Sequence, residues 1–149
     1  MPANAPDEIW DAVVAEAEES IRREPMLASF LQATILNHKS LEDALSFHLA
    51  TKLESVTLPA LSLRELMDTA FGSETTIREA VRADMRAVVT RDPACGRYSN
   101  PLLYYKGFQA LQAYRVAHYY WNQARQPLAL FLQSRISDVF AVDIHPAAR

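Results

Sequence analysis

Apolar residues recur every three or four positions through most of this chain, with polar residues between them. This spacing places the apolar side chains on one face of an α-helix. The first helix is predicted to start at Asp7 and to stop at Glu24-Pro25, because proline pushes the residue before it out of the helical region. Its apolar stripe consists of Ile9, Trp10, Val13, Val14, Ala17 and Ile21.

Prolines, glycines and capping residues separate the helices that follow. A short helix is predicted from Met26 to about Leu36, and Ser40-Leu-Glu-Asp43 is a variant capping box that opens a third helix. Pro59 starts a fourth helix. This helix is expected to end at Phe71-Gly72-Ser73, with the glycine just past its C-terminus and the serine as the next N-cap.

The second half of the chain begins with a fifth helix, predicted to run to about Thr90. Residues 91–101 hold two prolines, a glycine and an Asp-Pro pair, so we expect a loop there. An unusually aromatic helix is predicted from Leu102 to about Arg125. Pro127 opens the last helix, and residues 139–146 look extended.

Composition supports a single all-α domain. The chain has 149 residues, of which 50% are hydrophobic and 22% are charged, as in globular proteins rather than disordered ones. Its three glycines are too few for many hairpins or for phosphate-binding loops. We therefore predict a multi-helix, bundle-like fold that ends in a short extended segment.

Charge and cysteine content limit the possible partners. The net charge of −3 gives no field that would attract nucleic acid, and the absence of a long apolar run argues against membrane insertion. Cys95 is the only cysteine, so an intrachain disulfide and a cysteine-rich zinc site are both excluded. We expect a soluble, cytoplasmic protein that binds neither nucleic acid nor a membrane.

Asp143 and His145 are the most suggestive pair of polar residues near the end of the chain. In an extended segment they would share one face, a spacing that could serve acid–base chemistry or bind a metal. A metal needs a third ligand, and the other histidines (His38, His48 and His118) have no ligand-like spacing. No metal site is predicted.

Two residues of the 91–101 loop leave alternatives open. Cys95 could be a nucleophile, but an ordinary loop cysteine is the favoured interpretation because little nearby would lower the pKa of a thiol. Asp92, in a loop with arginines on either side, could contact a ligand, could be a residue of a helix C-terminal turn, or could simply belong to an Asp-Pro turn. From spacing alone the turn is favoured, and the residues by themselves define no reaction.

Six short stretches, in this order and spacing, resemble the N-terminal helical domain of bacterial serine acetyltransferases of cysteine biosynthesis. The stretches are Glu24-Pro-Met-Leu-Ala-Ser-Phe30, Arg91-Asp-Pro-Ala94, Pro101-Leu-Leu-Tyr104, Lys106-Gly-Phe108, Ala110-Leu-Gln-Ala-Tyr-Arg115 and Val142-Asp-Ile-His-Pro-Ala-Ala148. The resemblance implies an enzyme that transfers acetyl from acetyl-CoA to L-serine, giving O-acetyl-L-serine and CoA, and that L-cysteine inhibits.

The resemblance also implies a domain plan. Residues 1–140 would form the helical oligomerisation domain, and residues 141–149 would begin a left-handed parallel β-helix of hexapeptide repeats. Those repeats are absent from these residues. We therefore expect a truncated chain that has no acetyltransferase activity by itself.

Two residues match functional positions of the family. Asp143 would orient the catalytic histidine, which would lie beyond Arg149 and is not His145. Asp92 would bind the amino group of serine or of inhibitory cysteine. No cofactor or metal would be bound within these residues, and acetyl-CoA would be a co-substrate of the whole enzyme.

The family's partners follow from the same resemblance. The helical domains would pair with each other and join two trimers into a hexamer, and O-acetylserine sulfhydrylase would bind a C-terminal tail absent here. Leftover apolar side chains would form the self-association surface, with Ile9, Trp10, Val13 and Phe30 as candidates. The alternative is a stand-alone helical adaptor or regulatory module without catalysis.

Overall fold

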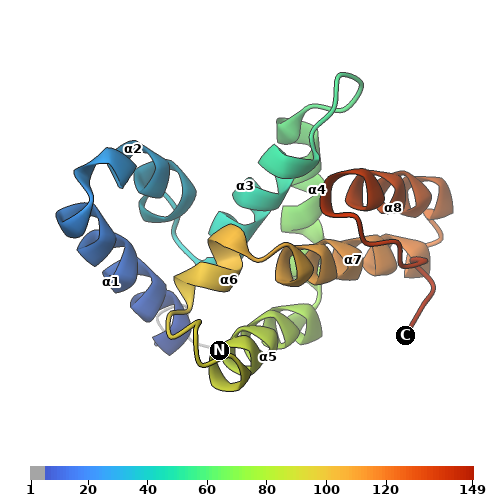
Figure 1. Ribbon diagram of the computed structural model, residues 1–149. Helices are drawn as coiled ribbons and strands as arrows, with labels where there is room; N and C mark the ends of the chain where they lie inside the picture. The colour runs from blue at the N-terminus through green and yellow to red at the C-terminus, as the bar shows by residue number, and fades with distance from the viewer. Residues whose placement is uncertain (1–5) are drawn as a thin grey trace.

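The computed structural model describes residues 6–149, which form helices and connecting segments without any strand (Figure 1). This confirms the predicted all-α class. In chain order the elements are α1 (Glu8–Arg23), the 3₁₀ turn η1 (Pro25–Leu27), α2 (Ala28–Leu31), the π-helical turn η2 (Gln32–Leu36), α3 (Leu41–Leu53), α4 (Ala60–Ser73), α5 (Thr75–Arg91), α6 (Ser99–Tyr104), α7 (Lys106–Asn122) and α8 (Gln126–Phe140).

Two N-terminal caps follow directly from the local sequence. The Asp7 carboxylate accepts a hydrogen bond from the Trp10 N–H at 3.2 Å, so α1 begins one residue after the predicted start. The Ser40 hydroxyl accepts one from the Asp43 N–H at 3.1 Å and opens α3 as predicted. Each side chain satisfies an amide that has no partner within its helix.

The boundary between α4 and α5 differs from the prediction. Gly72 and Ser73 belong to α4, and Glu74 both ends α4 and precedes α5 without a side-chain cap. The Glu74 N–H donates to the Ala70 carbonyl, which closes the last turn of α4. Phe71, in this last turn of α4, is 1% exposed and belongs to the core.

The long aromatic helix is also two helices. Tyr105 has extended backbone angles and separates α6 from α7, and α6 starts at Ser99 within the predicted loop. Pro101 is compatible with this start, because its missing N–H falls in the first turn. The break leaves two α6 carbonyls for side chains: Gln109 Nε2 donates to Leu102 at 2.9 Å, and His48 Nε2 lies 3.2 Å from the Leu103 oxygen.

The end of the chain is more helical than predicted. Val139 and Phe140 belong to α8, and Phe140 is 4% exposed, so burial extends the helix over the start of the predicted extended segment. Ala141 ends α8 in the left-handed conformation, with φ of 58°. Residues 142–145 have no regular secondary structure.

The helices are arranged around one core. α1 and α2 lie on one side of the molecule, α4, α7 and α8 lie on the other, and α3 and α6 lie between them (Figure 1). Among the largest fully buried side chains are Ile35, Leu45, Leu49, Leu63, Met67, Phe71, Met85 and Tyr120. No helix within residues 6–149 is both long and apolar enough to cross a membrane.

The predicted association surface is wrong at three of its four positions. Ile9, Trp10 and Val13 are 2%, 8% and 0% exposed, because the apolar stripe of α1 packs against η1, η2, α2 and α6. Phe30 is 37% exposed and remains at the surface. A long apolar stripe therefore identified core positions and not a free face.

Candidate functional site

Asp92 stands at the C-terminal end of α5 and starts a segment, residues 92–98, that we call the Asp92 loop. Its side chain is half-buried, and its Oδ1 atom accepts a hydrogen bond from the Ala94 N–H at 3.0 Å. This is the local turn that the sequence favoured. Its Oδ2 atom makes no hydrogen bond within the described residues, so one carboxylate oxygen is available to a ligand.

The interior of the Asp92 loop is held by its own residues. Cys95 is 1% exposed, its N–H donates to the Asp92 carbonyl at 3.0 Å, and its thiol donates to the Arg97 carbonyl at 3.3 Å. The pKa of Tyr105 is raised by its interaction with the Cys95 thiol, then by burial and the negative charge of Asp92. Cys95 thus packs as a structural residue between the loop and Tyr105.

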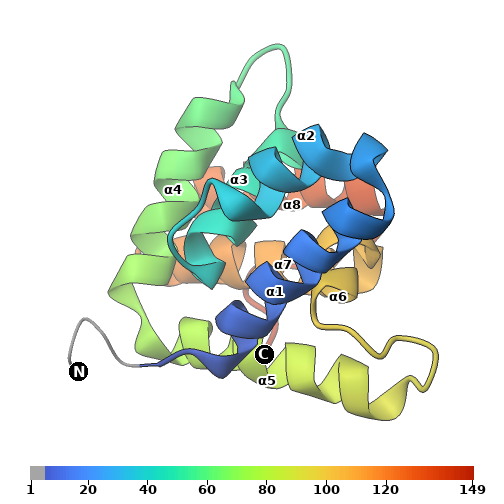
Figure 2. The same cartoon turned by 90° about the vertical axis from the view of Figure 1, so that its left-hand side faces the viewer.

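Hydrogen bonds join the far end of the Asp92 loop to α1. Figure 2 shows α1 lying beside α6 and beside the segment that leads into α6 from α5. Two residues make this connection, Glu16 on α1 and Arg97 in the loop. Sequence reasoning missed both, because only the fold brings together positions about eighty residues apart.

Asp143 lies in the tail, residues 141–149, which follows α8. The residue is exposed, and its carboxylate accepts a hydrogen bond from Gln133 Nε2 at 2.8 Å. His145 packs edge-to-face on Trp121 with ring centroids 4.8 Å apart, and its Nδ1 accepts from the Ala147 N–H at 3.1 Å. The expected pairing of Asp143 and His145 on a strand face is therefore absent from the described residues, because no neighbouring strand fixes their direction.

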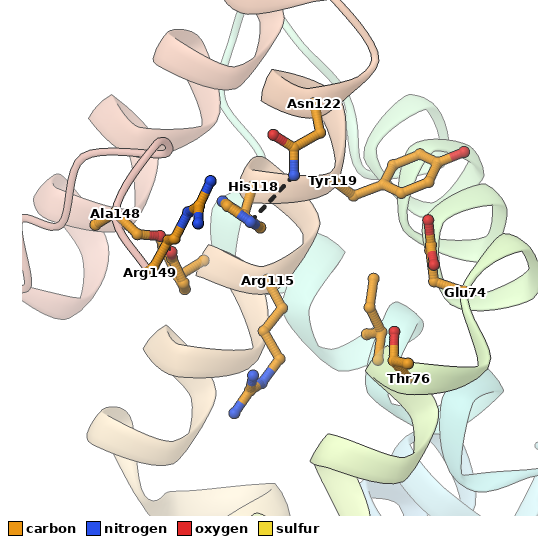
Figure 3. A pocket seen from close by; sticks show the side chains of 10 residues that line it. Glu74, Thr76, Arg115, His118, Tyr119, Asn122, Ala148 and Arg149 are labelled. Atoms are coloured by element: carbon orange, nitrogen blue, oxygen red, sulfur yellow. Dashed lines mark hydrogen bonds between the residues drawn. The ribbon is translucent and has the colours of Figure 1, made fainter.

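The tail lies along α7, and Ala148 and Arg149 line one side of an open pocket of about 390 Å³ (Figure 3). His118 Nδ1 lies 2.6 Å from the Pro146 oxygen, and the Tyr114 hydroxyl donates to the Ala148 carbonyl. Glu74, Arg115 and Asn122 also line the pocket. Arg115 forms an ion pair with Asp84, with 2.8 Å between Nη2 and Oδ2, so its positive charge is already neutralised.

The two carboxylates expected at the site remain apart. Asp92 ends α5, Asp143 follows α8, and neither lines the pocket beside the tail. Within residues 6–149 no three histidine, cysteine, aspartate or glutamate side chains gather as a metal site would require. What the domain offers chemically is one anchored carboxylate and one exposed carboxylate on separate segments.

This helical arrangement, with an anchored aspartate loop after α5, is that of a known domain class. Residues 9–113 match the family model described as "Serine acetyltransferase, N-terminal". That match covers more than half of the chain, and the chain belongs to this family.

Individual relatives agree with the family match. The chain is 50% identical to the serine acetyltransferase of Escherichia coli strain K12 over 141 residues, which are 95% of this chain and 52% of that protein. A soybean serine acetyltransferase solved in complex with serine is 57% identical, with a TM-score of 0.93 over 97% of this chain and 61% of that one. A serine acetyltransferase solved in complex with CoA is 51% identical, with a TM-score of 0.93 over 95% and 60%. The chain spans about half the length of the curated relatives it matches.

Proposed function

We propose that this chain is the N-terminal domain of a serine O-acetyltransferase of L-cysteine biosynthesis. The reaction transfers acetyl from acetyl-CoA to the hydroxyl of L-serine and yields O-acetyl-L-serine and CoA. The observation that carries the proposal is the match to the serine-bound soybean enzyme, at 57% identity over 97% of this chain. The CoA-bound relative supports acetyl-CoA as co-substrate.

Asp92 is proposed to bind the amino group of serine. A carboxylate with one oxygen committed to a local turn and the other without a partner suits an ammonium group, which would donate a charge-assisted hydrogen bond. The short loop keeps the carboxylate half-buried, where such a bond is stronger than in water.

Asp143 is proposed to orient a catalytic histidine supplied from outside residues 1–149. Within the described residues its exposed carboxylate accepts one side-chain hydrogen bond, from Gln133, and can therefore accept another from an imidazole N–H. An aspartate in that position fixes the tautomer of the histidine and stabilises the imidazolium formed when the serine hydroxyl is deprotonated. His145 has no part in this step, since its ring is packed on Trp121.

The test uses a fusion that joins residues 1–149 to the part of the Escherichia coli enzyme that follows the matched stretch. We expect serine-dependent release of CoA by the fusion and none by residues 1–149 alone. Asp92→Asn, which keeps the Ala94 contact but removes the charge, should raise the KM for serine roughly tenfold. Asp143→Asn should lower kcat roughly a hundredfold.

His145→Ala in the same fusion is the control and should leave both constants near their parent values. A folded but inactive fusion, or CoA release by residues 1–149 alone, would contradict the proposed function. An unchanged KM for serine in Asp92→Asn would remove Asp92 from the substrate site without affecting the rest of the proposal.

Self-association is proposed as the second role of the domain. Met26, Phe30 and Tyr104 are 93%, 37% and 55% exposed, and the rings of Phe30 and Tyr104 stack with centroids 6.4 Å apart. We propose that this surface pairs two helical domains and so joins two trimers into a hexamer. The resemblance also implies O-acetylserine sulfhydrylase as a partner of the whole enzyme, and we propose no residue of this chain as its binding site.

Light scattering on residues 1–149 tests the association. Met26→Glu should weaken self-association because it places a charge in the apolar surface. Val56→Glu is the matched control, since Val56 is equally exposed but lies between α3 and α4. A strictly monomeric chain at high concentration would contradict the role.

We also propose that the protein acts in the cytoplasm. The free, buried Cys95 thiol supports this location, because thiols stay reduced there.

A further inference from the structure

We infer that Glu16 on α1 is a positioning residue for Asp92: it anchors the far end of the Asp92 loop and thereby fixes where that carboxylate meets the substrate. The inference rests on the proposed function, because it assigns serine binding to Asp92. Its structural part, the anchoring, is measurable without any catalysis.

The carboxylate of Glu16 bridges two backbone amides at the end of the loop. Its Oε1 accepts from the Ser99 N–H at 2.8 Å, and its Oε2 accepts from the Tyr98 N–H at 3.2 Å. These amides stand at the start of α6, which has no side-chain cap of its own. A residue of another helix therefore supplies the cap, and its negative charge suits the positive end of the helix dipole.

Arg97 completes the connection in the opposite direction. Its Nη2 atom donates to the Glu16 carbonyl at 2.7 Å and to the Ser20 hydroxyl at 3.2 Å. Its Nε atom lies 4.0 Å from Glu16 Oε1, and the two side chains are only 29% and 18% exposed. Since α1 is bonded to the loop through both its backbone and its side chains, the loop cannot shift along α1 without breaking several bonds.

Because the loop is short, an anchor at its far end also restricts the position of Asp92. One end is fixed by the Asp92 N–H, which donates to the Val88 carbonyl in the last turn of α5. The other end is fixed by Glu16, and Gly96 turns the chain between them with φ of 55°. A segment of seven residues held at both ends has few conformations left, and releasing one end would let the Asp92 carboxylate sample several positions.

Hydrogen exchange of individual amides in residues 1–149 tests the anchoring. Glu16→Ala should speed exchange at the Tyr98 and Ser99 amides roughly tenfold, and Glu16→Gln, which keeps one acceptor oxygen, should have a smaller effect. Glu18→Ala is the matched control, because Glu18 is exposed on the same helix and its side chain makes no hydrogen bond within residues 6–149. Unchanged exchange in Glu16→Ala would overturn the inference.

Kinetics of the fusion test the consequence for the substrate. Glu16→Ala should raise the KM for serine about fivefold to tenfold, with little change in the KM for acetyl-CoA, and Glu16→Gln should restore part of the loss. In combination with Asp92→Asn it should add almost nothing, because both changes affect one contact. A purely structural role would instead lower the active fraction and leave the KM for serine unchanged.

The failures are distinguishable. A normal KM for serine in Glu16→Ala, with Asp92→Asn impaired, overturns the positioning role and leaves the proposed function intact. A normal KM in Asp92→Asn removes Asp92 from serine binding and overturns the positioning role with it, whatever hydrogen exchange reports. Equal effects of Glu16→Ala and Glu18→Ala would also overturn it, because the effect would then belong to α1 in general.

Discussion

Asp92 and Asp143 both lie in segments without regular secondary structure, yet their surroundings differ. The Asp92 loop is held by Cys95, by the turn at Gly96, and by Glu16 and Arg97 at its far end. The tail that carries Asp143 is largely exposed, although Pro146 is buried and Val142 packs against the core. It contacts α7 through two hydrogen bonds and one ring contact, and Asp143 itself makes one hydrogen bond to α8.

This difference indicates which part of the candidate site the domain determines by itself. The position of Asp92 follows from contacts among α1, α5 and α6, all within residues 6–149. The Asp143 carboxylate makes one hydrogen bond, to Gln133, so contacts from outside these residues can move it at a small cost in free energy. We therefore expect changes near the loop to affect the whole domain and changes in the tail to remain local.

The largest expected effect concerns His48, which supports α6 just beyond the Asp92 loop. Burial, and then the charge of Lys52, lowers the pKa of His48 from 6.5 to about 4. A depressed histidine pKa means that the unfolded chain binds the proton more readily. The stability contributed by neutral His48 is therefore complete above pH 6.5 and is lost as the pH falls from 6.5 to about 4.

His48→Gln, which keeps a donor for the Leu103 carbonyl, should remove this component of the pH dependence. The shift corresponds to about 3 kcal/mol of unfolding free energy. Urea denaturation at several pH values between 4 and 7 measures it, with His145→Gln in the tail as the control. A variant with the same slope as the parent would show that His48 does not support α6 as a neutral residue.

A smaller effect is expected at Gly96, where the loop turns with φ of 55°. An alanine Cβ would meet nothing within 4 Å, so only backbone strain opposes Gly96→Ala, at about 1 kcal/mol. Gly72 also has open space around it but lies inside α4, so Gly72→Ala should stabilise the domain by about 0.5–1 kcal/mol.

Denaturant melts of the two glycine variants give opposite signs if the loop is anchored. A loop free to change its conformation would avoid the strain, and Gly96→Ala would then leave stability unchanged. In that case the contrast between the Asp92 loop and the tail would weaken, because neither segment would be fixed by the domain.

The sequence predicted the parts of this fold that depend on local chemistry. The apolar stripe of the first helix and the Ser40 cap need only neighbouring residues, and both agree with the structure. The local turn at Asp92 was predictable for the same reason, because the aspartate bonds an amide two residues away.

The remaining features depend on contacts between distant residues. Tyr105 itself is neither proline nor glycine, and the break there is stable because His48 and Gln109 satisfy the carbonyls that it leaves free. Glu16 belongs to the polar face of α1, and nothing near it in the sequence indicates that it caps α6. Burial of Trp10 likewise depends on which helix covers the stripe, so the sequence could not separate core from interface.

The smallest effect is expected in the tail. Tyr114→Phe removes the hydroxyl that donates to the Ala148 carbonyl at the surface, and should change the free energy of unfolding by less than about 0.5 kcal/mol. Exchange at the Ala147 and Ala148 amides should nevertheless become faster, because that bond is one of the contacts that hold the tail on α7. Tyr120→Phe is the matched control: its hydroxyl donates to the Leu66 carbonyl in the core, and its loss should cost about 1 kcal/mol. If Tyr114→Phe cost as much as Tyr120→Phe, the tail would unfold together with the core, and Asp143 would be as firmly placed by this domain as Asp92.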